Sequence, residues 1–282
     1  MTYRGDGISI AIPVVLYYNK AKRKTSQQAD KLPNEPGRFG RRDDMLSCHI
    51  LLGCGALSLI LYLTEKTRRY SVKGVLLKTL VSAFFVAVAL YGWYTAAGGR
   101  GPSPLGIFVI LGLLLGLTGD VWLDLKFVYP QQDGIYTYAG FTAFGIGHVL
   151  FIAGLLLRYA RPGALWYVLS ALGLALLLDL LTLALEKPMK LRYGRMRPIV
   201  AAYGFLLFST VLVAGSLALF WGWQERTLNL FFAGGVLFAL SDLILSGTFF
   251  GEGKERPVDF ILNYLTYYGG QFLIAYSLAW LS

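Results

Sequence analysis

The chain has 282 residues, of which 56% are hydrophobic and 15% charged, and its formal net charge is +10. Its mean hydropathy of +0.56 argues against a water-soluble domain and indicates a polytopic membrane protein. The basic residues lie in loops and in the N-terminal tail, without a basic face interleaved with aromatic side chains. We therefore expect membrane lipids with anionic headgroups as their partners, and no nucleic acid.

Residues 1–45 differ in composition from the rest of the chain. Their run of 11 mostly apolar residues, ISIAIPVVLYY, is too short to span a bilayer, and the polar, basic stretch after it is typical of a flexible segment. The basic cluster follows the apolar run, whereas in a cleavable signal it would come first. We expect residues 1–45 to be an extension of a membrane domain formed by residues 46–282, with an interfacial anchor as the alternative.

From residue 46 onward, apolar windows of about 20 residues, the length that a bilayer core requires, recur along the chain. None shows the alternation of a barrel strand, so the windows predict an all-α bundle of about eight transmembrane helices. The loops and the tail favour opposite orientations, so the sequence leaves the orientation open. The windows are residues 46–64, 74–94, 104–125, 137–157, 163–185, 198–222, 228–249 and 259–281.

Ionisable residues interrupt several of these windows. Each costs about 2.5 to 3.5 kcal/mol at membrane depth on insertion scales, so it needs a partner, a cavity or a function. Lys78 is close enough to the end of the second window to extend to the lipid headgroups. The other interpretation is that Lys78 neutralises a carboxylate or a substrate phosphate.

The third window ends in GLTGDVWLDL, in which Asp120 and Asp124 are one helical turn apart and share a face. Two carboxylates so close in a low dielectric resist joint ionisation, so one keeps a proton that acid–base chemistry can use. Asp124 has an alternative place at the membrane interface, beside the loop that begins at Lys126.

Single polar residues mark three later windows. His148 follows two glycines that leave room for a ligand or for a neighbouring helix to which it would hydrogen-bond. Asp242 is too deep to face lipid, so it is either functional or bonded to another helix. Asp179 has no glycine or aromatic neighbour, and we assign it to packing or to the interface.

The last window carries Tyr267, Tyr268 and Gln271, and the glutamine shares a face with both tyrosines. A glutamine in lipid needs hydrogen-bond partners, which a polar pocket would supply.

The order and spacing of these residues resemble the YhhN-like lysoplasmalogenase family of eight-span membrane proteins. The similarity runs through most of residues 74–276. It rests on Lys78 in LLKTL, Asp120 after Gly119, G-x-x-x-F-x-x-G-H from Gly140 to His148, Pro198 and Tyr203 in RPIVAAY, Asp242 at the end of GGVLFALSD, and Gln271 in YYGGQFLIA.

The resemblance implies hydrolysis of the vinyl ether bond of a lysoplasmalogen, a lysophospholipid, to a fatty aldehyde and a glycerophospho-headgroup. This chemistry needs a general acid and a nearby anion, and we expect no cofactor. Asp120 and Asp242 are the expected acid and base, in either order, with His148 orienting one carboxylate or the water. The other candidates would bind the substrate or line its pocket: Lys78, Asp124, Tyr203, Tyr267, Tyr268 and Gln271.

Two alternatives belong to other classes. A zinc site with three histidines is disfavoured because the chain contains only His49 and His148, although two histidines with carboxylates could still hold a metal. A proton-coupled transporter or a lipid-binding protein without hydrolysis would also need intramembrane acids. Transporters of that kind usually show paired halves, which this sequence lacks. The sequence carries no signal for a particular oligomeric state.

Overall fold

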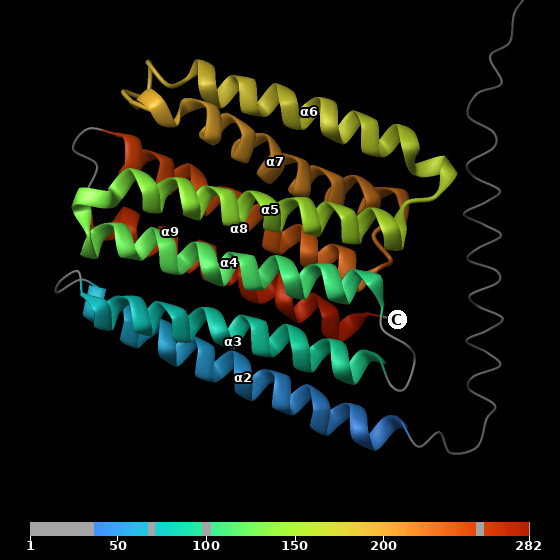
Figure 1. The fold of residues 1–282 in the computed structure, drawn as a ribbon. Coiled ribbons are helices and arrows are strands. Elements are labelled where there is room, and N and C mark those ends of the chain that lie inside the picture. The colour runs from blue at the N-terminus through green and yellow to red at the C-terminus, as the bar shows by residue number, and fades with distance from the viewer. Residues whose placement is uncertain (1–36, 67–70, 98–102, 252–256, 282) are drawn as a thin grey trace, which may run out of the picture. The chain divides into compact units, whose positions relative to one another are not determined.

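The structure of the chain, a computed structural model, describes residues 37–66, 71–97, 103–251 and 257–281. The predicted extension, residues 1–45, therefore lies almost entirely outside the described residues. The described residues form eight α-helices and no strand, which confirms the all-α prediction (Figure 1). The helices are α2 (Gly37–Lys66), α3 (Val72–Ala97), α4 (Pro104–Val128), α5 (Asp133–Tyr159), α6 (Leu165–Ala184), α7 (Arg197–Phe220), α8 (Arg226–Phe250) and α9 (Pro257–Ser277).

Seven of the described helices, α2 to α8, are long and apolar enough to cross a membrane. The chain is therefore a multi-pass integral membrane protein. The eighth helix, α9, is less apolar because it carries Asn263, Tyr264, Tyr267 and Gln271, all of which are buried in the bundle. These polar side chains face the interior of the bundle, where they have hydrogen-bond partners.

Consecutive helices run in opposite directions, and most of them pack as neighbours, whereas α5 and α6 are separated by α7 (Figure 1). The most extensive contacts join α4 to α5, α8 to α9 and α6 to α7. Helix α6 lies at the edge of the bundle against α7. Helix α2 contacts α9, where Phe272 fills the space beside Gly55 and the rings of Tyr62 and Tyr264 meet edge to face.

Helices α8 and α9 approach closely at a pair of glycines. A Cβ atom at Gly270 would lie 2.6 Å from the carbonyl oxygen of Gly234, and one at Gly234 would lie 2.7 Å from the carbonyl oxygen of Gly270. Neither backbone can yield without separating the helices. Small residues at such a crossing are the usual means of close helix packing in membranes.

The substitution Gly270→Ala should therefore destabilise the bundle, by about 1 to 3 kcal/mol for an overpacked contact. Gly173→Ala is the matched control, because a Cβ there meets nothing within 4 Å and alanine favours a helix. Thermal unfolding of the purified protein in detergent should give a lower Tm for G270A and an unchanged or higher Tm for G173A. Equal melting of the two variants would contradict this crossing.

Candidate active site

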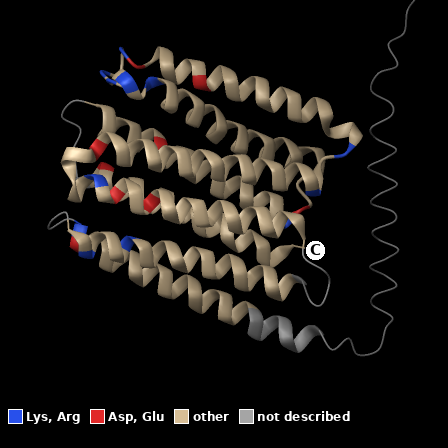
Figure 2. Ribbon diagram, in the orientation of Figure 1, with Lys and Arg blue, Asp and Glu red and all other residues tan. Residues whose placement is uncertain are grey.

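Most of the acidic residues in the described helices lie toward one end of the bundle (Figure 2). At this end α4 and α8 finish, while α3 and α9 begin. Lys78 is in the second turn of α3, Asp120 and Asp124 are in the last turns of α4, and Asp242 is two turns before the end of α8. The antiparallel course of the helices thus brings residues that are distant in the sequence to the same end of the bundle.

Two lysines and two aspartates form a buried network. The ammonium nitrogen of Lys78 lies 3.2 Å from Asp120 Oδ1 and 3.5 Å from Asp124 Oδ1. The ammonium nitrogen of Lys66 lies 2.9 Å from Asp124 Oδ1. The four residues are only 1% to 6% exposed. Water therefore cannot solvate their charges, and each charge is stabilised by the opposite charges of the network. Lys78 therefore points into the bundle and neutralises carboxylates, and Asp124 is a buried member of the same network.

Hydroxyl groups complete the surroundings of the two aspartates on α4. Ser82 and Tyr267 donate hydrogen bonds of 2.6 and 2.8 Å to Asp120 Oδ2. Tyr62 donates to Asp124 Oδ2 at 3.1 Å. Each carboxylate thus faces lysine on one side and tyrosine on the other, which fixes its orientation.

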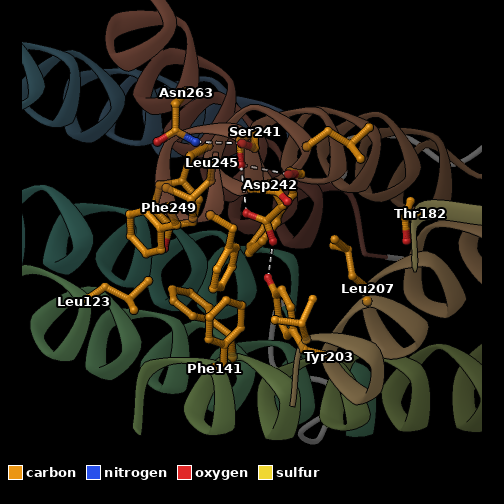
Figure 3. A pocket seen from close by; sticks show the side chains of 18 of the residues that line it. Leu123, Phe141, Thr182, Tyr203, Leu207, Ser241, Asp242, Leu245, Phe249 and Asn263 are labelled. Atoms are coloured by element: carbon orange, nitrogen blue, oxygen red, sulfur yellow. Dashed lines mark hydrogen bonds between the residues drawn. The ribbon is translucent and has the colours of Figure 1, made fainter. Parts of the chain in front are cut away.

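Asp242 has different surroundings (Figure 3). Tyr203 donates a hydrogen bond to its Oδ2, and the Ser241 hydroxyl lies 3.3 Å from its Oδ1. The backbone of Ser241 is held in turn by Asn263, whose side-chain nitrogen donates to its carbonyl oxygen at 2.7 Å. Among the described residues no lysine or arginine forms an ion pair with Asp242. Its described partners are therefore hydroxyl groups, whereas Asp120 also has a cation.

Asp120 and Asp242 line the same cavity, which has a volume of about 360 Å³. No hydrogen bond joins the two carboxylates within the described part of the chain. Most of the remaining wall is apolar, with contributions from α4 to α9. Of the other candidates, four also line this cavity: Lys78, Asp124, Tyr203 and Tyr267.

His148 does not take the expected position. Its Nδ1 lies 3.1 Å from the Thr210 hydroxyl, and its ring packs against those of Tyr203 and Phe238. It is outside the cavity lining, and no hydrogen bond joins it to Asp120 or Asp242 in the described structure. In the described structure His148 thus contacts neither carboxylate, and its expected role in orienting a carboxylate or the water stays a prediction. Both of these rings line the cavity, so the contact of His148 with the site is through Tyr203 and Phe238.

Tyr268 and Gln271 also lie behind the lining. Gln271 donates a hydrogen bond of 3.1 Å to the hydroxyl of Tyr267, and the Tyr268 hydroxyl lies 3.4 Å from that of Ser82. Both therefore support the two hydroxyls that donate to Asp120.

Sequence reasoning missed Lys66, Tyr62 and Ser82. Lys66 lies just beyond the first apolar window, residues 46–64. The available signal is its spacing of four from Tyr62, which places both on one helix face. Asp179, which we assigned to packing or to the interface, packs against Gly204 of α7 and also lines the cavity.

A family model described as the YhhN family matches residues 74–278. The chain belongs to the YhhN family. Comparisons of the chain with curated proteins and with solved structures found no match. The matched segment of this YhhN-family protein contains Lys78, Asp120 and Asp242, whereas Lys66 and Tyr62 precede it. Helix α2 therefore contributes to the buried network from outside the matched segment.

The described residues contain no group of three or more histidine, cysteine or acidic side chains arranged to hold a metal ion. The two histidines of this YhhN-family protein are separated. His49 hydrogen-bonds Tyr276 at 3.2 Å, while His148 pairs with Thr210.

The Lys66–Asp124 pair should be strongly coupled. Lys66→Met leaves two carboxylates to share Lys78, and loss of one member of a buried pair typically costs about 3 to 5 kcal/mol. The double variant K66M/D124N restores the balance of charge, so it should lose much less stability than the sum of the single variants. A double-mutant cycle of thermal unfolding in detergent measures this coupling.

Lys73→Met is the control, because Lys73 is 66% exposed and its pair with Glu65 should contribute less than about 1 kcal/mol. Additive losses in the cycle would show that Lys66 and Asp124 do not interact.

Proposed function

We propose that this YhhN-family protein is a lysoplasmalogenase-like hydrolase that cleaves the vinyl ether bond of a lysophospholipid. The observation that carries the proposal is the unlike surroundings of two carboxylates in one cavity. Asp120 has a cation beside it, whereas Asp242 has hydroxyl partners in the described structure. Such a difference divides the roles of acid and base between chemically identical groups. The apolar wall suits an alkenyl chain.

The reaction begins with transfer of a proton to the β-carbon of the vinyl ether, which leaves an oxocarbenium ion at the α-carbon. Water adds to that carbon and forms a hemiacetal. The hemiacetal then breaks its bond to the glycerol oxygen and yields a fatty aldehyde. One water molecule is consumed, and the glycerol oxygen leaves as a hydroxyl.

We assign the first proton to Asp242. An ionised Asp242 would be a charge without an ion-pair partner in the described structure, beside a largely apolar cavity, and such a charge is costly. The hydrogen bond from Tyr203 orients the carboxyl group.

Asp120, paired with Lys78, is the anion that stabilises the oxocarbenium ion and accepts a proton from the attacking water. In the second half of the reaction Asp120 returns this proton to the leaving glycerol oxygen. Asp242 takes up the proton of the hemiacetal hydroxyl, which restores both groups to their starting states.

The purified protein in detergent should release free aldehyde from a lysoplasmalogen. Asp120→Asn and Asp242→Asn should each lower the rate by about 100-fold or more, the usual contribution of general acid–base catalysis, while the protein remains folded. Asp133→Asn is the matched control, since Asp133 is an exposed acid at the start of α5.

Aldehyde release at the wild-type rate by D120N or D242N would refute the assigned pair. Binding of the lipid by the wild-type protein without any aldehyde would instead favour the lipid-binding alternative.

A further inference from the structure

Asp179 on α6 is a buried acid that the reaction scheme does not use. The residue is 5% exposed, and its side chain lines the cavity together with Thr182 from the next turn. No described residue makes a hydrogen bond or ion pair to its carboxylate. A buried carboxylate of this kind is costly without a partner. Its place in the wall of a cavity makes a bound ligand the natural partner.

Helix α7 makes room for this carboxylate. A Cβ atom at Gly204 would overlap Oδ1 of Asp179, so the acid reaches its position because residue 204 has no side chain. The preceding residue, Tyr203, donates its hydroxyl to Asp242. In Figure 3, Thr182 and Leu207 lie on the side of the cavity formed by α6 and α7, across from Asp242. Consecutive residues of α7 thus contact the two acids, and both acids line one cavity.

The charges around the cavity identify the kind of ligand. The basic and acidic side chains in its lining are those of Lys78 and of four aspartates, at positions 120, 124, 179 and 242. Lys78 and Lys66 together balance Asp120 and Asp124. With Asp242 as the proton donor, Asp179 is the remaining acid without a counter-charge in the described structure. A ligand with a positive group would supply that counter-charge.

Aromatic rings in the same lining also suit a cation. Phe141 and Tyr203 are in contact with a centroid distance of 5.1 Å, and Tyr193 and Phe250 with one of 5.0 Å. The faces of aromatic rings attract ammonium groups.

We propose that Asp179 binds the ammonium group of the substrate headgroup and so determines which headgroups this protein accepts. The proposal rests on the proposed hydrolase in one respect, namely that the ligand is a lysophospholipid. The charge on Asp179 would act on binding of the headgroup, while the bond-breaking steps stay with Asp120 and Asp242. Asp179 is thus a specificity-determining residue.

The test measures binding apart from catalysis. The probes are two 1-O-alkyl lysophospholipids that lack the vinyl ether, one with an ethanolamine headgroup and one with a neutral glycerol headgroup. Isothermal titration in detergent should show that the wild-type protein binds the ethanolamine lipid about 10-fold or more tightly than the glycerol lipid. Asp179→Asn should weaken binding of the ethanolamine lipid alone and remove this preference.

Three further variants sharpen the result. Gly204→Ala displaces the carboxylate without removing its charge, so it should also abolish the preference. Asp179→Glu keeps the charge and should keep part of the preference. Asp133→Asn removes an exposed acid and should keep all of it. Because D179N removes a charge that has no described partner, its Tm should be equal to or higher than that of the wild-type protein. G204A tests the headgroup preference independently, because it leaves Asp179 itself unchanged.

Equal binding of the two lipids by the wild-type protein would overturn the proposal. So would an unchanged preference in D179N, or an equal loss of binding for both lipids. Turnover separates this result from the proposed reaction. A headgroup preference that D179N abolishes, in a protein that releases no aldehyde, would support the subsite and refute the hydrolase. Aldehyde release, together with a headgroup preference that D179N leaves unchanged, would support the hydrolase and refute the subsite.

Discussion

The buried network of Lys66, Lys78, Asp120 and Asp124 is the constraint on which the site depends. At membrane depth none of these charges is tolerable alone, because lipid offers neither water nor counter-ions. The network joins α2, α3 and α4, and the tyrosine that donates to Asp120 extends it to α9. A helix that rotated away from this arrangement would leave a buried charge without a partner. The polar contacts therefore select one packing of helices whose apolar surfaces alone would permit many.

The same network explains how one cavity holds two different carboxylates. Both lysines are engaged by the aspartates of α4, so α8 presents Asp242 to hydroxyl groups. The ring of His148 packs against those of Tyr203 and Phe238 and so supports the tyrosine that donates to Asp242. Acid and base thus differ because they belong to different helices with different neighbours. This separation is what the proposed vinyl ether hydrolysis needs, since protonation and stabilisation of the cation occur at adjacent atoms of one substrate.

In the proposed function, helix α6 supplies the side chain that binds the substrate headgroup. It lies at the edge of the bundle, yet it contributes a buried acid where α7 has a glycine. The surplus negative charge of the lining and its aromatic rings would together match a lipid headgroup with a positive end. Recognition of the headgroup and cleavage of the bond would then rest on separate helices, so that one can change without the other.

The sequence by itself determined the helices and the candidates at depth. Apolar windows of membrane length must be helical, so α2 to α8 could be predicted. Ionisable residues in such windows need a partner or a cavity, which singled out Lys78, Asp120 and Asp242, and all three line one cavity. Only the tertiary structure decided that Lys66 pairs with Asp124, that His148 lies behind Tyr203 and that Asp179 faces the cavity. The reason is physical: a helix that is apolar on nearly all sides carries little record of its rotation about its own axis. That rotation is set by close packing at glycines and by the pairing of charges between helices.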